Sequence, residues 1–208
     1  MKNLPDSIVV IGAGGHAKVV IATVRAAGGD VVAVYDDDQS RWGQRVLGVP
    51  IKGPISGEEI GSSPAIIAIR NNRARQAIAE RLRAQWVSVC HPSTTVHASV
   101  SLGPGTVVFA GVVIQPDATI GAHSILNTAA SVDHDCIVGD FVHIGPGVSL
   151  CGGVTLDEGV LLGVGAKVAP NVEIGPWSTA GAGAVCVVDV PGSTTVVGVP
   201  ARPVEADA

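Results

Sequence analysis

A histidine between two aspartates is the feature of this chain with the clearest capacity for chemistry. Asp133, His134 and Asp135 lie near the start of SVDHDCIVGDFVHIG, residues 131–145, and His143 follows nine residues after His134. A carboxylate that hydrogen-bonds one ring nitrogen of a histidine fixes the tautomer and raises the basicity of the other nitrogen. We therefore predict that His134 acts as a general base.

Two other chemistries compete for this cluster. Its side chains have metal-ligand chemistry, but the sequence has neither a helical H-x-x-x-H spacing nor a partner cysteine in a recognisable pattern, so we expect no metal. A serine nucleophile would call for a G-x-S-x-G turn, which the sequence lacks. Direct transfer between two bound substrates with one base remains, and Asn127, seven residues before His134, is placed to supply a positioning amide.

A glycine-rich turn near the N-terminus points to phosphate binding. VIGAGGHAKVV matches G-x-G-x-x-A at Gly12, Gly14 and Ala17, after a strand-like run and at the start of a helix-like segment. Such a turn lets backbone N–H groups approach a phosphate, so we assign Gly12, Gly14 and Gly15 to substrate binding and place His16 beside a diphosphate or sugar. The region has only about half the size of a dinucleotide fold, which favours a mononucleotide diphosphate. The alternative is a turn that merely packs the helix on the strand.

Polar residues also follow two further strand-like runs. Asp36 and Asp37 come after VVAVY, and Arg70 and Asn71 follow AIIAI. Open α/β sheets bind ligands at the carboxyl ends of their strands, so we expect the two carboxylates to accept hydrogen bonds from a base or ribose, and Arg70, with Asn71 beside it, to pair with a phosphate. A solvated turn for the aspartates, and a helix cap for Asn71 and Asn72, are the alternatives.

The chain divides near residue 90 into two regions of different pattern. Residues 1–90 alternate strand-like and helix-like segments, which predicts a small parallel sheet. The Gly-, Pro- and Ser-rich residues 37–64 read mainly as loop, with room for one short strand or helix. From Val96 to Ile174, Leu, Ile or Val recurs every six residues, the signature of a parallel β-helix in which residues three repeats apart stack. We therefore predict a half-Rossmann α/β domain followed by a β-helix, residues 91–208, with a C-terminal cap.

The composition excludes several classes of partner. Lys and Arg number 13 against 18 Asp and Glu, a formal net charge of −5, so no basic surface suits nucleic acid. The sequence has no apolar run long enough to enter a membrane and no leader pattern, which predicts a cytoplasmic protein without membrane insertion. The four cysteines are far apart and read as small buried side chains.

Several segments together resemble a known family. They are IGAGGHAKVV, YDDD, AIRNN, ILNTAASVDHDCIVGDFVHIGPG and VVGVPARP, and the resemblance covers nearly the whole chain. The chain is similar to the bacterial nucleotide-aminosugar N-acetyltransferases, hexapeptide-repeat enzymes whose group includes sialic-acid O-acetyltransferase-like proteins. The resemblance implies a left-handed β-helix, a homotrimer, acetyl-CoA as donor and a UDP- or GDP-linked 4-amino-4,6-dideoxy sugar as acceptor.

The resemblance also implies roles for single residues. His134 matches the general base, Asp135 the acid that orients it, and His143 a group near the thioester. The turns at Gly152 and Ala182 match those that line the acetyl-CoA groove. The chemistry agrees, because the sugar amine must lose a proton as it attacks the thioester, and backbone N–H groups of glycine-rich turns can stabilise the oxyanion.

The chain departs from the family pattern in two places. Arg70 stands where the family often has glycine, which points to a different preference for base, phosphate or sugar. Asp135 stands where glutamate is common, so Asp133 stays open as the orienting acid.

Three alternative functions also stay open. The first is a sialic-acid-type sugar O-acetyltransferase that uses the same base. The others are a non-catalytic β-helix that binds sugar nucleotides or acts as a scaffold, and a carbonic-anhydrase-like metalloenzyme on the same architecture. Because the sequence combines the glycine loop with the aspartates of the α/β region, it favours a nucleotide-linked acceptor.

Overall fold

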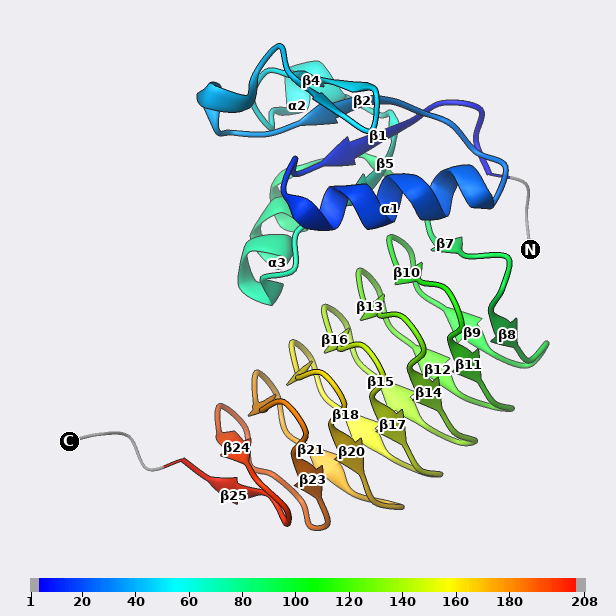
Figure 1. Ribbon diagram of the computed structural model, residues 1–208, viewed down its shortest axis with the longest axis vertical. Coiled ribbons are helices and arrows are strands. Elements are labelled where there is room, and N and C mark those ends of the chain that lie inside the picture. Colours follow the sequence, from blue (N-terminus) through cyan, green and yellow to red (C-terminus); the bar gives the residue numbers. More distant parts are fainter. Residues whose placement is uncertain (1–3, 205–208) are drawn as a thin grey trace.

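The structure, a computed structural model, describes residues 4–204. An α/β unit lies at one end of a long stack of triangular coils (Figure 1). Helix α1 (Gly15–Ala26) packs on one face of the unit's sheet and lies next to the first coil. Helices α2 (Gly57–Ile60) and α3 (Asn72–Arg81) pack on the other face.

The sheet of the α/β unit is parallel except at one edge. Its strand order is β3-β4-β2-β1-β5-β6, and only β3 and β4 pair antiparallel. The strands are β1 (Ile8–Ile11), β2 (Val31–Tyr35), β3 (Arg45–Val46), β4 (Val49–Lys52), β5 (Pro64–Ile67) and β6 (Gln85–Trp86). Because β1 lies between β2 and β5, the chain leaves it toward opposite sides, which opens a crevice at the carboxyl ends of these strands.

The segment 37–64 is more regular than its composition predicts. It holds the short helix η1 (Gln39–Arg41), the β3–β4 hairpin and α2. Val46, Val49 and Ile51 in the hairpin are buried and belong to the same apolar cluster as α1. Burial of these three side chains favours the hairpin over an irregular loop.

The rest of the chain forms a β-helix of short strands on three faces. Val108 pairs with Leu126, and Leu126 with Ile144, so each coil takes 18 residues, as the sequence predicts. The first face contains β7 (Val89–Cys90), β10 (Val107–Val108), β13 (Ile125–Leu126), β16 (His143–Ile144), β19 (Leu161–Leu162), β22 (Thr179–Ala180), β24 (Thr195–Val197) and β25 (Arg202–Pro203). The second contains β8 (Thr95–Val96), β11 (Val113–Ile114), β14 (Ser131–Val132), β17 (Ser149–Leu150), β20 (Lys167–Val168) and β23 (Val185–Cys186). The third contains β9 (Ser101–Leu102), β12 (Thr119–Ile120), β15 (Ile137–Val138), β18 (Thr155–Leu156) and β21 (Glu173–Ile174).

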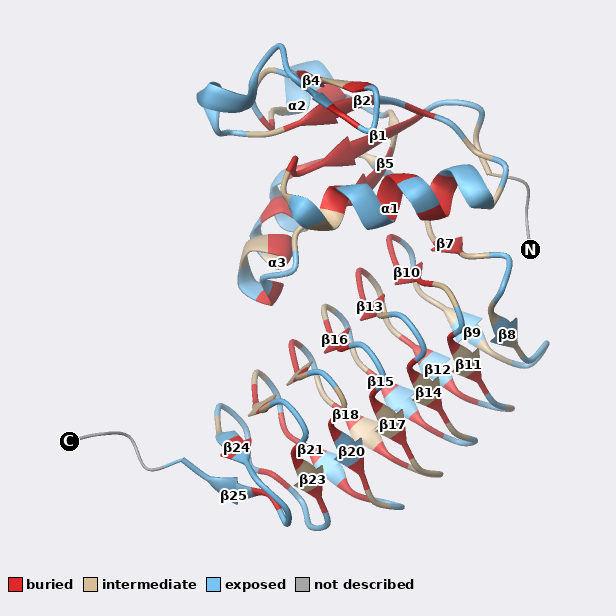
Figure 2. Ribbon diagram, viewed as in Figure 1, coloured by how far each residue is buried: buried red, intermediate tan, exposed pale blue. Residues whose placement is uncertain are grey.

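The core of the β-helix is built from the predicted hexad positions. From β10 to β24, the second residue of each strand is almost fully buried and belongs to one apolar cluster (Figure 2). The three cysteines Cys90, Cys136 and Cys186 are buried among them, and Cys151 is half-buried. All four are free thiols, which agrees with their interpretation as small packing residues.

The outward residues differ from face to face. Val107 and Ile125 on the first face are each 1% exposed, because they join Phe109 and α1 in one apolar cluster. Ile137, which has the equivalent position on the third face, is 55% exposed. The α/β unit therefore covers the first coils of the first face, and the two parts of the chain share one apolar core there.

Among residues 4–204, every helix is too short or too polar to traverse a lipid bilayer.

Candidate active site

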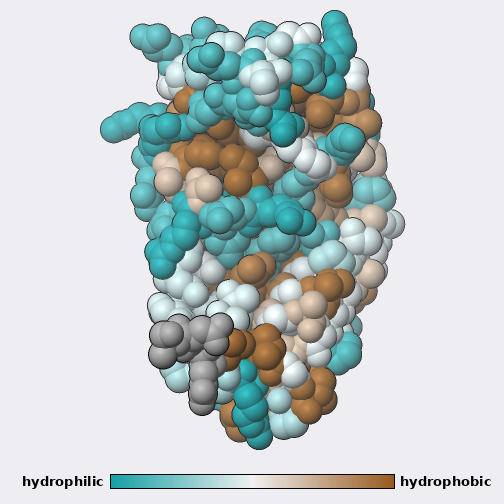
Figure 3. Space-filling view, turned by 60° about the vertical axis from the view of Figure 1, so that its left-hand side comes forward, coloured by the Kyte–Doolittle hydropathy of each residue, from teal (hydrophilic) through white to brown (hydrophobic). Residues whose placement is uncertain are grey.

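A pocket of about 800 Å³ opens at the carboxyl ends of β1, β2 and β5. Figure 3, a space-filling view of one side of the molecule, shows apolar surface between hydrophilic bands of the α/β unit. The pocket brings together most of the residues that the sequence assigns to substrate binding and adds apolar walls. Its lining includes Gly12, Gly14, Gly15, His16, Val19, Asp36, Asp37, Ile55, Ala68, Ile69, Arg70, Ala74, Ile78 and Asn127.

The glycine turn forms one wall of this pocket. Gly12 has φ +99°, and a Cβ there would lie 2.7 Å from Ile69 Cγ1, so both conformation and space restrict this position to glycine. Gly14 is the N-cap of α1 and carries no side-chain cap, and a Cβ on Gly14 or Gly15 would meet open space. The first N–H groups of α1 are thus available to an anion in the pocket.

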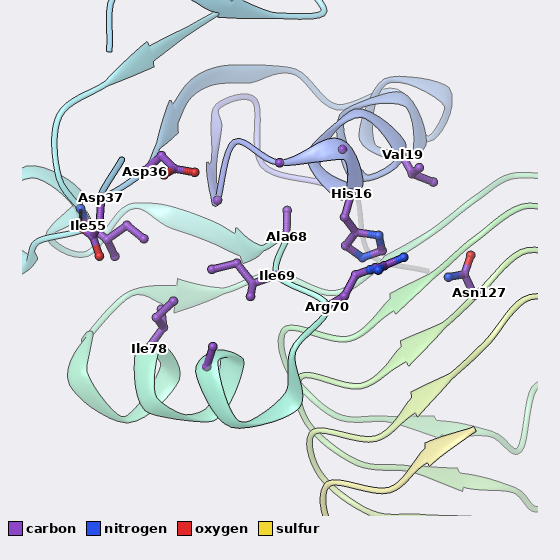
Figure 4. A pocket seen from close by; sticks show the side chains of 14 residues that line it. His16, Val19, Asp36, Asp37, Ile55, Ala68, Ile69, Arg70, Ile78 and Asn127 are labelled. Carbon is purple, nitrogen blue, oxygen red and sulfur yellow. Dashed lines mark hydrogen bonds between the residues drawn. The ribbon is translucent and has the colours of Figure 1, made fainter. Parts of the chain in front are cut away.

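The two aspartates lie at the end of the pocket away from the β-helix (Figure 4). The Asp36 carboxylate accepts from the backbone N–H of Ala13 at 2.5 Å and from that of Asp38 at 2.9 Å. Asp37 accepts from the N–H of Ile55 at 2.8 Å. Both carboxylates therefore brace the loops that form the pocket, and each has remaining lone pairs for a ligand.

The opposite end of the pocket adjoins the β-helix. His16, Arg70 and Asn127 lie together there (Figure 4), and the Asn127 amide lies 3.4 Å from His143 Nε2. The His16 and His143 ring centroids are 6.3 Å apart. The structure thus groups His143 with the α/β pocket.

These two histidines are held in the neutral form. Burial lowers the pKa of His16 to about 4, and the positive charges of Arg70 and Arg75 add to the effect. Burial lowers the pKa of His143 to about 3, again with the help of Arg75 and Arg70. His16 Nε2 is buried and has no hydrogen-bond partner within the described chain, so one polar atom in the pocket wall is unsatisfied.

Asn71 and Arg75 lie at the start of helix α3. The Asn71 side chain accepts from the N–H of Ala74 at 2.9 Å and caps α3, which matches its alternative interpretation. It lines a second, smaller recess of about 340 Å³ beside Trp177 rather than the main pocket. Arg75, which was not predicted as a site residue, is buried and donates a hydrogen bond to the backbone carbonyl of Arg70. Arg75 lies three residues after Asn72 and three before Ile78, so it shares the buried face of α3 with them. This helical spacing was the signal in the sequence that could have identified Arg75 as a buried cation.

His134 lies in a different setting, at the turn between β14 and β15. Its Nδ1 is 2.7 Å from Asp135 Oδ2, and the side chain is 61% exposed. The hydrogen bond to Asp135, followed by the negative charge of Asp133, raises the pKa of His134. Asp133 instead accepts from the His134 backbone N–H at 2.8 Å, so Asp135 is the acid that contacts the ring.

Gly152 lies directly against His134. A Cβ on Gly152 would lie 2.6 Å from both Cε1 and Nε2 of the His134 ring. The absence of a side chain at Gly152 therefore leaves the space that the imidazole occupies. Ala182 lies in a different turn of the coils, between β22 and β23.

His134 and His143 are on opposite sides of the prism. The His134 turn joins the second face to the third, whereas β16, with His143, belongs to the first face. A corner between two faces of a triangular prism is opposite the remaining face. One chain therefore keeps the exposed base away from its own pocket, and His134 is absent from the pocket lining.

Within residues 4–204, the structure gathers no group of three or more His, Cys, Asp or Glu side chains in a metal-binding arrangement. The acidic and imidazole groups near residue 134 form a histidine–aspartate pair, which suits proton transfer.

A nucleotide-sized pocket on a hexapeptide β-helix with an exposed histidine–aspartate pair defines an acyltransferase of the hexapeptide-repeat class. Residues 7–82 match the family model of the PglD N-terminal domain. A perosamine N-acetyltransferase from Caulobacter crescentus, solved with one histidine substituted and in complex with CoA and GDP-perosamine, superposes with a TM-score of 0.89. It is 44% identical over 96% of this chain and 97% of that chain.

Two further proteins agree with this likeness. The acetyltransferase domain of PglB from Neisseria gonorrhoeae FA1090 has a TM-score of 0.89 at 38% identity, over 96% of this chain and 100% of that chain. GDP-perosamine N-acetyltransferase from Escherichia coli O157:H7 is 28% identical over 93% of this chain and 94% of its own length. The chain belongs to the bacterial nucleotide-aminosugar N-acetyltransferases. This membership confirms the predicted fold class, an α/β half-Rossmann unit followed by a left-handed β-helix, and the predicted enzyme class.

Proposed function

We propose that this enzyme transfers the acetyl group of acetyl-CoA to the amine of a GDP-linked 4-amino-4,6-dideoxy sugar, with GDP-perosamine as the first substrate to test. The observation that carries the proposal is the 44% identity, over 97% of its length, to a protein solved with CoA and GDP-perosamine. The match covers both the α/β unit and the β-helix, so the likeness bears on donor and acceptor alike.

Residues 1–90 would hold the nucleotide sugar and residues 91–208 would carry out the transfer. The diphosphate fits the first N–H groups of α1 at Gly14 and Gly15. The guanosine would then extend toward Asp36 and Asp37, and the sugar toward the end of the pocket that adjoins the β-helix. This direction places the amine on the side from which a base on a β-helix can reach it.

His134 supplies the base for this reaction. With Nδ1–H held by Asp135, Nε2 accepts a proton from the amine as its nitrogen attacks the thioester carbonyl carbon. The C–N bond forms, the C–S bond breaks, and the proton passes from His134 to the departing thiolate. Backbone N–H groups near Gly152 and Ala182 would line the acetyl-CoA groove and stabilise the oxyanion.

We place each active site between two copies of the chain in a homotrimer. His134 lies at the corner opposite the face that carries His143, so a single chain cannot present both to one sugar. In a closed three-fold assembly, the corner of one prism meets the first face of its neighbour, which brings the base of one copy to the pocket of the next. We place the reaction in the cytoplasm, where acetyl-CoA and nucleotide sugars are made.

The test is release of CoA, followed with a thiol reagent, when the purified protein is given acetyl-CoA and a panel of acceptors. The panel contains GDP-, UDP- and dTDP-linked 4-amino sugars and free sialic acid. Turnover of the GDP-linked amine, with a product that survives mild alkali as an amide does, supports the proposal. Turnover of only a UDP- or dTDP-linked sugar would reassign the base, and turnover of sialic acid alone would make the enzyme an O-acetyltransferase.

A further inference from the structure

Arg75 is a buried cation without an acidic partner. Its side chain is 1% exposed, and none of the ion pairs among residues 4–204 includes it. An unpaired buried charge is costly, so its retention calls for hydrogen bonds that satisfy all of its donors. The structure supplies these from two separate parts of the chain.

One set of acceptors belongs to the loop that forms a wall of the pocket. Arg75 Nη1 donates to the backbone carbonyl of Ile69 at 2.9 Å and to that of Arg70 at 3.2 Å. Both residues line the pocket.

The other set belongs to the β-helix. Arg75 Nε donates to the carbonyl of His123 at 2.7 Å, and Nη2 donates to that of Phe141 at 2.7 Å, two residues before His143. Nη2 also donates to Asn72 Oδ1 at 2.9 Å, and the Asn72 amide donates to the carbonyl of Gly159 at 3.0 Å. One planar guanidinium thus fixes the pocket loop against two successive coils.

We infer that Arg75 is a positioning residue for the acceptor substrate, because it holds the loop of Ile69 and Arg70 in register with the coil that carries His143. This inference rests on the proposed function, since it assigns the nucleotide sugar to that pocket. Only arginine fits the role, because its fork directs donors to acceptors on several sides at once, whereas lysine has one compact ammonium group. The residue touches no substrate and acts through the loop and the coil.

The test compares Arg75→Lys and Arg75→Met with the wild-type enzyme in steady-state kinetics with both substrates varied. Loss of charged hydrogen bonds to the loop should raise KM for the nucleotide sugar about tenfold or more, with the smaller rise in Arg75→Lys. KM for acetyl-CoA should stay within about twofold, because its groove lies on the β-helix. Gln76→Ala is the matched control, because it removes a hydrogen bond from the same helix to Glu158 of the β-helix, 2.7 Å long, without touching the loop.

A purely structural role gives a different result. It would lower kcat in proportion to the folded fraction and leave both KM values unchanged, which would overturn the inference. An inactive wild-type enzyme would contradict the proposed function instead, so the two failures are distinguishable.

Hydrogen exchange of the wild-type protein provides the second measurement if the variants do not fold. Nucleotide sugar alone should slow exchange both at residues 69–75 and at residues 141–143, because Arg75 couples them. Protection confined to the loop would overturn the inference.

Discussion

Histidine side chains have opposite properties in two regions of this molecule. At the corner between the second and third faces, His134 is exposed and Asp135 raises its pKa. At the junction with the α/β unit, burial lowers the pKa of His143 to about 3. The corner therefore suits proton transfer, whereas burial at the junction keeps the imidazole of His143 neutral.

The difference follows from position in the coil. His143 has the outward position of a strand on the face that the α/β unit covers, as Val107 and Ile125 do. His134 lies in a turn, where no other part of the chain covers it. Cover by the α/β unit thus sets the protonation of a histidine on this β-helix, and the following predictions test this contrast.

His134→Ala should have the largest effect. Loss of the base should lower kcat about a thousandfold. His97→Ala is the matched control, because His97 is an exposed turn histidine whose ring nitrogen contacts Ser99 at 2.9 Å rather than a carboxylate. The His97→Ala enzyme should keep wild-type activity. CoA release measures both, and equal losses in the two variants would contradict the role of the Asp135 pair.

Gly152→Ala should follow. The new Cβ would lie 2.6 Å from the His134 ring, and because that side chain is exposed, it can rotate away without disturbing the fold. We expect kcat to fall about a hundredfold, and the free energy of unfolding to stay within about 0.5 kcal/mol. Gly57→Ala, where a Cβ meets nothing within 4 Å, is the control. Wild-type turnover in Gly152→Ala would show that the ring position does not matter.

Asp135→Asn should change the pH dependence. Asn tolerates the left-handed backbone at this position, where φ is +60°, so the turn should persist. The base works only when neutral, and Asp135 raises its pKa, so the acid limb of kcat/KM should move to lower pH in the variant, with a plateau about tenfold lower. Asp133→Asn should shift the limb less, because that carboxylate contacts the backbone N–H of His134. An unmoved limb in Asp135→Asn would assign it to another group.

Protonation of the buried His123, which does not line the pocket, should affect stability rather than turnover. Burial lowers the pKa of His123 from 6.5 to about 4, so between these values only the unfolded chain takes up a proton, and stability falls as pH falls. His123→Phe keeps the stack on Phe141 and should lessen this loss by up to about 1.4 kcal/mol per pH unit. Urea unfolding at several pH values measures the slope. His97→Gln should leave it unchanged, and a wild-type slope in His123→Phe would contradict a neutral buried ring.

The sequence predicts the β-helix almost residue by residue, because Leu, Ile or Val recurs every six residues from Val96 to Ile174, at the inward position of each strand. It also predicts the pocket, since the glycine turn and the polar strand ends must meet at one edge of a parallel sheet. It does not predict the junction. Arg75 reads as one more surface arginine of a charged helix, and its burial depends on backbone carbonyls of His123 and Phe141, which no sequence pattern records.

The placement of His143 was likewise only partly predictable. Its face carries Val107 and Ile125 at outward positions, and this recurrence of apolar residues one coil apart was a signal for a covered face. The resemblance placed His143 near the thioester. The structure places it beside His16 and Asn127, and its contact with the thioester stays a prediction.

The central claim is that the base of one chain serves the pocket of another, and complementation of two inactive variants tests it most directly. His134→Ala lacks the base. Gly14→Asp puts a favourable N-cap on α1 but repels a diphosphate from the pocket. When the two are co-expressed in equal amounts and assemble at random, the whole population should regain about a quarter of wild-type activity, because about a quarter of all shared sites combine an intact base with an intact pocket. Mixed trimers no more active than the separate variants would contradict the claim and place each site within a single chain.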